Sequence, residues 1–76
     1  MKGTAMLKLS ARNQFPGTIT GIRQGVTTTH VTIEVAPGVV VTAAITNESA
    51  EELGLAVGGE AVAVIKASDV MVGTKG

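Results

Sequence analysis

Residues 26–45 read VTTTHVTIEVAPGVVVTAAI, and this stretch decides the fold class. Apolar and polar residues alternate through residues 26–35, so one face collects the apolar side chains Val31, Ile33 and Val35. Ala36-Pro37-Gly38 then supplies a tight turn, and a second run follows at residues 39–45. That run opens with three consecutive valines, so both of its faces need covering. The stretch predicts two strands, the second covered by barrel closure or by a neighbouring subunit.

Further strands and one helix are expected on either side of this pair. Residues 6–14 and 18–23 have strand composition, and Phe15-Pro16-Gly17 between them predicts a break. On the other side, residues 47–54 predict a short helix, residues 60–65 a strand, and residues 70–72 a short edge strand. This order predicts an all-β domain, a small five-stranded OB-like barrel with one short helix between strands 4 and 5. Residues 6–72 form that single domain, between tails at residues 1–5 and 73–76.

The expected helix carries signals at both of its ends. Ser49 and Glu52 have the spacing of a capping box, although Thr46 or Asn47 is an equally good N-cap. Gly54 is placed to end the helix in a left-handed conformation. One or two turns of helix do not persist without tertiary support, so this helix must pack against the strands.

The length and the residue types favour an oligomer. A chain of 76 residues buries only about 60% of its unfolded surface, and such chains usually need disulfides, a metal or partners. There is no cysteine, and one histidine, His30, does not make a zinc cluster. Abundant aliphatic residues in so small a chain predict an apolar interface. The alternative is that single exposed valines carry no meaning.

Charge and aromatic content argue against nucleic acid and membrane partners. Six basic and six acidic side chains give a net charge of zero, and Phe15 is the single aromatic residue. Neither a strong positive field nor an aromatic platform for stacking bases is available. No apolar run approaches the about 20 residues that span a bilayer, and the first residues lack the pattern of a signal peptide. We therefore expect a cytoplasmic protein.

Three polar groups interrupt the apolar pattern. They are Ser10-Ala11-Arg12-Asn13-Gln14, Thr46-Asn47-Glu48-Ser49 and Lys66. All three groups offer hydrogen-bond donors that suit an oxyanion. The first has a guanidinium and a hydroxyl, the second has hydroxyls and the backbone N–H groups of a helix start, and the third is an ammonium group. Each group also has an ordinary interpretation, as a solvated turn, a helix cap and a lysine that extends to water. No nucleophile, acid–base or phosphate-loop pattern accompanies them, so we expect a binding protein and not an enzyme.

These segments together resemble the molbindins, the small molybdate-binding proteins also called Mop, whose domain belongs to the transport-associated OB (TOBE) group. The resemblance covers residues 6–72. It is carried by several short motifs that occur in family-like order: Ser10-Ala11-Arg12-Asn13-Gln14, Gly17-Thr18-Ile19, Ala44-Ile45-Thr46, Ser49 with Leu53-Gly54-Leu55, and Val64-Ile65-Lys66-Ala67.

The resemblance implies a cytoplasmic homohexamer, a trimer of dimers, that stores molybdate or tungstate. The metal would be bound only as the oxyanion, with no organic cofactor. By match to the family pattern, the oxyanion would be held between subunits by Ser10, Ala11, Arg12, Thr46, Ser49 and Lys66. Two alternatives remain open at this point, a nucleic-acid-binding OB module and a purely structural oligomerisation domain.

Overall fold

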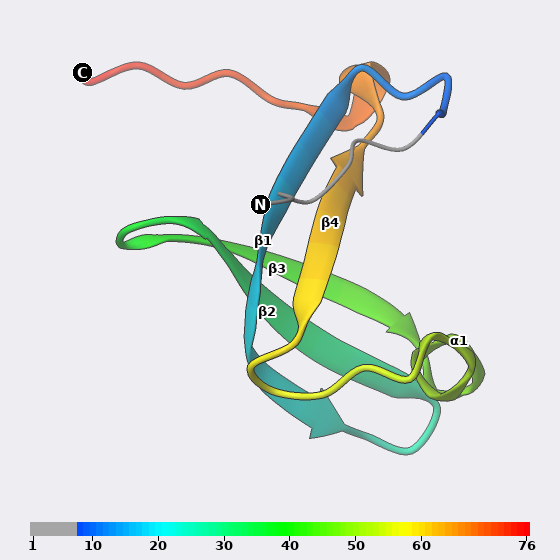
Figure 1. The fold of residues 1–76 in the computed structure, drawn as a ribbon. Coiled ribbons are helices and arrows are strands. Elements are labelled where there is room, and N and C mark those ends of the chain that lie inside the picture. Colours follow the sequence, from blue (N-terminus) through cyan, green and yellow to red (C-terminus); the bar gives the residue numbers. More distant parts are fainter. Residues whose placement is uncertain (1–7) are drawn as a thin grey trace.

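The computed structural model describes residues 8–76 and shows one curled antiparallel sheet (Figure 1). The strands lie in the order β3-β2-β1-β4. A 3₁₀ helix, η1, follows the last strand. The elements are β1 (Asn13–Gln24), β2 (Thr28–Ala36), β3 (Val39–Thr46), α1 (Asn47–Leu53), β4 (Glu60–Ile65) and η1 (Ala67–Asp69).

The first strand differs from the sequence-based prediction. Phe15-Pro16-Gly17 does not break the chain but lies within β1, which continues through it. Over residues 13–17, β1 pairs only with β4, so its other edge is unpaired. A proline, which has no backbone N–H to donate, is tolerated within a strand at such an unpaired edge. Residues 8–12 are irregular instead of forming a strand, and Met6 and Leu7 lie outside the described residues. The edge strand suggested at residues 70–72 does not form.

One strand therefore takes part in two ladders. Residues 13–18 of β1 pair with β4, and residues 18–24 pair with β2, with a register shift between Ile19 and Gly21. Changing partners at Thr18 curls the sheet into a half-barrel (Figure 1). The predicted all-β, OB-like class with a short helix before the last strand is confirmed. The predicted count of five strands is wrong for residues 8–76, which form four.

The core lies on the concave side of this sheet. Val31 and Ile33 are buried there with Ile19 and Ala63, as the alternation in β2 predicted. This cluster is small, and a groove of about 210 Å³ opens beside it. Several large apolar side chains remain exposed on the single chain, including both valines at the start of β3, Val39 and Val40.

The short helix is held at both ends. Its N-cap is Thr46, not Ser49: the Thr46 side chain accepts a hydrogen bond from the Ser49 N–H at 3.0 Å. Gly54 ends it at φ 63°, and its N–H bonds the carbonyls of Ala50 and Glu51. The left-handed end predicted at Gly54 is thus confirmed. Within residues 8–76, no helix has both the length and the apolar character to cross a bilayer.

Candidate functional site

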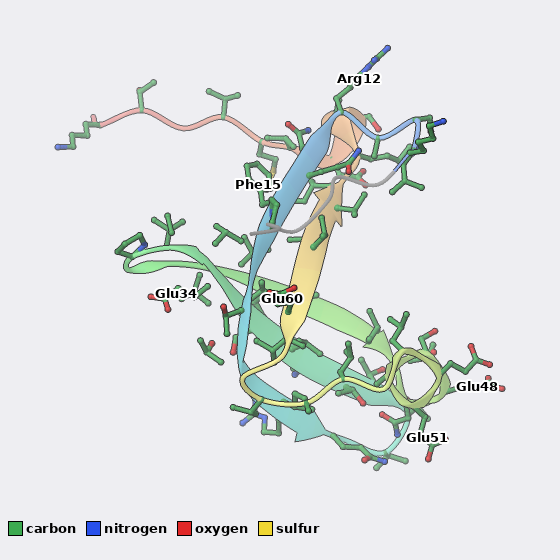
Figure 2. All side chains as sticks on the ribbon, viewed as in Figure 1. Arg12, Phe15, Glu34, Glu48, Glu51 and Glu60 are labelled. Carbon is green, nitrogen blue, oxygen red and sulfur yellow. The ribbon has the colours of Figure 1, made fainter. Side chains whose placement is uncertain are left out.

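Arg12 and Lys66 lie at one end of the sheet, where β1 begins and β4 ends. Asn13 pairs with Ile65 across the two strands, Arg12 directly precedes that pair, and Lys66 directly follows it. Both charged side chains are exposed, and Arg12 points away from the sheet (Figure 2). We call this region, residues 10–12 with Lys66, the cationic end. It brings two positive charges from distant parts of the sequence to the same edge.

Two amide side chains hold the cationic end in place. Asn13 Nδ2 donates to the Ile65 carbonyl at 3.2 Å, which ties the start of β1 to the end of β4. Gln14 Nε2 donates to the Ala11 carbonyl at 3.4 Å, which bends the preceding segment back onto the strand. Ala11 is partly buried, whereas Ser10 is exposed. Hydrogen bonds on both sides of Arg12 therefore anchor its backbone, and within residues 8–76 its exposed guanidinium has no hydrogen-bond partner.

Thr46 and Ser49 form a second polar group at the start of α1. Thr46 Oγ1 accepts from the Ser49 N–H and donates to Ser49 Oγ at 2.9 Å. In this arrangement the Ser49 hydroxyl keeps its own hydrogen for an outside acceptor. The Asn47 N–H is already bonded to the Thr27 carbonyl at 3.0 Å. The backbone N–H groups of Asn47 and Ser49 are thus already bonded, and the Ser49 hydroxyl keeps a hydrogen for an oxyanion. We call Thr46 and Ser49 the hydroxyl pair.

Asn47 fixes the hydroxyl pair to the turn between β1 and β2. Its Nδ2 donates to the carbonyls of Gly25 at 3.1 Å and Val26 at 3.0 Å. Its Oδ1 accepts from Thr29 Oγ1 at 2.6 Å, and Thr29 is 2% exposed. Both the NH₂ group and the oxygen of the Asn47 side chain are thus hydrogen-bonded, and the oxygen is the acceptor for the buried Thr29 hydroxyl.

We expect Asn47→Ala to destabilise the domain. It leaves the buried Thr29 hydroxyl without its acceptor and frees two turn carbonyls, which costs about 2 kcal/mol. The melting temperature should fall by roughly 10 °C in a domain of this size. Thermal unfolding at fixed protein concentration measures this, with the exposed neighbour Glu48→Ala as the control. Equal melting temperatures for the two variants would contradict the role given to Asn47.

The cationic end and the hydroxyl pair lie at opposite ends of the molecule. Thr46 pairs with Thr28 beside the β1–β2 turn, whereas Arg12 precedes the far end of β1. At about 3.3 Å per residue the 12 residues of β1 can span more than 30 Å. Figure 2 shows Arg12 above the start of β1 and the α1 residue Glu48 near the opposite end of the molecule. The structure therefore forms two separate groups from the six predicted site residues, and one chain does not bring the groups together.

Other chemistry finds little support in the part of the chain that the structure describes. There, no group of three or more His, Cys, Asp or Glu side chains could hold a metal ion. His30 is exposed on β2, between Arg23 and Ala44 of the neighbouring strands. The sequence missed the anchoring roles of Asn13, Gln14 and Asn47. All three lie in the polar segments, but their bonds follow from contacts that adjacent residues do not reveal.

Comparison with known proteins gives one consistent family. Residues 9–72 match the model of the TOBE domain. The chain is 46% identical over 66 residues to molybdenum-pterin-binding protein 1 of Clostridium pasteurianum, which covers 87% of this chain and 97% of that protein.

Two solved structures share the fold. MopII from Clostridium pasteurianum, in an apo form, superposes with a TM-score of 0.83 at 43% identity, covering 88% of this chain and 100% of that chain. The cytoplasmic molybdate-binding protein ModG, with molybdate bound, gives a TM-score of 0.81 at 43% identity, covering 86% of this chain and 46% of that one.

Proposed function

The chain belongs to the molbindin family of TOBE-domain proteins, and on that premise we propose that it binds molybdate or tungstate between the subunits of a homo-oligomer, for storage in the cytoplasm. One observation carries the proposal: the six candidate residues form two groups at opposite ends of the folded molecule. In an intersubunit site, the cationic end of one copy meets the hydroxyl pair of another. Each interface then supplies every donor type that the ligand needs.

The chemistry of the two groups suits a doubly charged oxyanion. Arg12 and Lys66 balance a charge of minus two, and each unit pair at 4 Å contributes about 4 kcal/mol at an effective dielectric of 20, before desolvation is subtracted. Both side chains only donate hydrogen bonds. They therefore offer no acceptor for the proton that phosphate carries near neutral pH. Molybdate, which carries none, makes no such demand.

An inorganic ligand fits the residues better than an organic one. The relative from Clostridium pasteurianum is named for a molybdenum-pterin, whereas ModG holds molybdate itself. A pterin ring is flat and is best held by aromatic faces, and this chain has a single aromatic residue, Phe15, on β1. We propose that the oxyanion is the whole ligand, with no organic cofactor and no catalysis.

The exposed apolar surface supports an oligomer, which we propose to be a hexamer, a trimer of dimers. Val39, Val40 and Leu53 are half to two-thirds exposed on the single chain. An apolar surface of this kind on a small domain marks an interface. A nucleic-acid-binding role finds no support, because the chain has a net charge of zero and a single aromatic residue on which a base could stack.

Native mass spectrometry with and without molybdate tests the proposal directly. We expect a hexamer that gains the mass of molybdate ions and does not gain the mass of a pterin complex. Sulfate at the same concentration should add no mass. A monomer that binds nothing would contradict the proposal, and equal uptake of sulfate would reduce the site to an unselective anion contact.

Ligand binding should also raise the melting temperature. A ligand that binds only the folded state stabilises it by about 2.7 kcal/mol at a hundred times its dissociation constant. At fixed protein concentration, the melting temperature should therefore rise with molybdate and not with sulfate. An unchanged melting temperature across the titration would argue against a site in the folded protein.

A further inference from the structure

Asn13 stands where β1 and β4 cease to run side by side. It is the first residue of β1 and pairs with Ile65, the last residue of β4, so the two form the final rung of this ladder. Arg12 lies one residue before the rung and Lys66 one residue after it, and neither belongs to a strand. The strand pairing itself therefore ends just short of both cations of the cationic end.

The Asn13 side chain adds a bond at this last rung. Its Nδ2 donates to the Ile65 carbonyl at 3.2 Å, and both residues are partly buried. The Ile65 carbonyl belongs to the peptide unit that joins Ile65 to Lys66, while Asn13 shares a peptide unit with Arg12. A peptide unit is planar and stiff. One hydrogen bond thus connects the two stretches of backbone from which the cationic side chains start.

The hydrogen bond of the neighbouring amide joins residues of a single segment. Gln14 Nε2 donates to the Ala11 carbonyl at 3.4 Å, three residues back along the chain. That bond shapes the turn that carries Arg12. Asn13 and Ile65 are 52 residues apart in the sequence, so their bond fixes one segment relative to the other.

Two positive charges at one edge of a sheet repel each other when no anion lies between them. Arg12 and Lys66 are both exposed, and within residues 8–76 neither takes part in an ion pair. A bond between their segments resists the separation that this repulsion favours. Donors that are already held in position lose less conformational freedom when a ligand arrives, and so they bind it more tightly.

We propose that Asn13 is a positioning residue that sets the separation of Arg12 and Lys66, and thereby the size of the oxyanion that these two cations hold together. This role rests on the proposed function and assigns to it a residue that acts through its neighbours. Molybdate and tungstate are larger than sulfate and carry the same charge. Charge alone does not distinguish them, whereas donors held at a fixed spacing do.

Isothermal titration of Asn13→Ala tests this role. We expect molybdate to bind about tenfold more weakly, the lower end of the about 10–100-fold loss that follows removal of a residue that orients a metal ligand. Sulfate should displace molybdate more readily, because donors that are no longer held apart at one spacing distinguish the two ions less. Thr20→Val is the matched control. It removes the 2.9 Å bond between Thr20 Oγ1 and Thr32 Oγ1 from the same strand and should change neither quantity.

A double-mutant cycle with Lys66→Ala separates positioning from general support of the fold. Asn13 has no separation to set once the ammonium group is gone. In the Lys66→Ala chain, Asn13→Ala should therefore weaken molybdate binding by less than about twofold, so the two losses are not additive. A residue that only supports the fold would weaken binding by the same factor in both chains.

Asn13→Asp repeats the test with a side chain of the same size. An ionised carboxylate accepts hydrogen bonds and donates none, so it loses the bond to the Ile65 carbonyl. Molybdate binding should fall at least as far as in Asn13→Ala. Circular dichroism and native mass spectrometry should show the natural fold and subunit number in both variants. Loss of either in both variants makes Asn13 a structural residue and overturns the positioning role.

The remaining outcomes distinguish this role from the proposed function. If the natural chain takes up molybdate and both Asn13 variants bind it equally well, the positioning role alone is refuted. Equal losses for Asn13→Ala in the natural and the Lys66→Ala chains refute it too. A natural chain that takes up no molybdate refutes the proposed function, and the positioning role falls with it.

Discussion

Replacing Arg12 by alanine should lower the affinity for molybdate at least about 100-fold, while the fold and the subunit number stay unchanged. A guanidinium can give two parallel hydrogen bonds to one oxyanion, each contributing about 1.5–3 kcal/mol. Since 1.4 kcal/mol is a tenfold change in affinity, two lost bonds exceed two orders of magnitude. Arg12 is exposed on the single chain, so its removal leaves no buried partner without a bond. Isothermal titration measures the loss.

Two further variants show what kind of interaction is lost. Arg23→Ala removes the same charge from β1, where Arg23 pairs with His30 near the other end of the strand, and should leave the affinity nearly unchanged. Arg12→Lys keeps the charge but not the paired donors, and should fall between Arg12→Ala and the natural chain. Equal weakening by Arg12→Ala and Arg23→Ala would mean that overall charge, and not a built site, attracts the anion.

The strands that the sequence predicted best are those that pair with close neighbours in the chain. The expected strands at residues 26–35 and 39–45 are β2 (Thr28–Ala36) and β3 (Val39–Thr46), joined by a turn at Pro37-Gly38. Their alternation and their turn are local, so local patterns suffice. The helix could also be predicted from local sequence, since its two capping residues, Thr46 and Gly54, lie within nine residues.

The candidate site was predictable in its parts and not in its arrangement. Each polar segment stands out in the sequence, but the placement of Arg12 and Lys66 at the same end of the sheet depends on the pairing of β1 with β4. Asn13 and Ile65, which pair there, are 52 residues apart in the sequence. The hydroxyl pair lies elsewhere, because Thr46 ends β3 and Ser49 belongs to α1, and neither element takes part in the pairing of β1 with β4. The separation of the two polar groups within one chain is thus a property of the topology, which no local motif encodes.

The error at Phe15-Pro16-Gly17 has the same origin. Proline and glycine together signal a turn when only neighbours in sequence are considered. Here the long-range ladder with β4 continues through Pro16, which lies opposite Val62. Gly17 is present for a different reason, the close approach of two strands. A Cβ atom added there would meet the Glu34 carbonyl oxygen at less than any normal contact and the Ile33 Cγ2 at 2.9 Å.

Gly17→Ala should therefore be among the most damaging single substitutions in this chain. The atoms in the way include the backbone of β2, which cannot move aside as a flexible side-chain tip can. Ile33 belongs to the small buried core, so a shift of β1 away from β2 opens that core as well. Overpacking of this kind costs about 3 kcal/mol. Domains of this length have only about 4–11 kcal/mol of stability in total.

Urea unfolding followed by circular dichroism, at fixed protein concentration, measures the effect. The midpoint should fall for Gly17→Ala and remain in place for Gly76→Ala, where an added Cβ has no atom within 4 Å. Gly17 adjoins Thr18, the residue at which β1 changes from pairing with β4 to pairing with β2. A lower urea midpoint for Gly17→Ala would therefore show that the close packing of β1 on β2, where the sheet curls, stabilises the fold. If Gly17→Ala unfolds at the same midpoint as Gly76→Ala, β1 and β2 do not approach each other this closely. The curl would then need another cause.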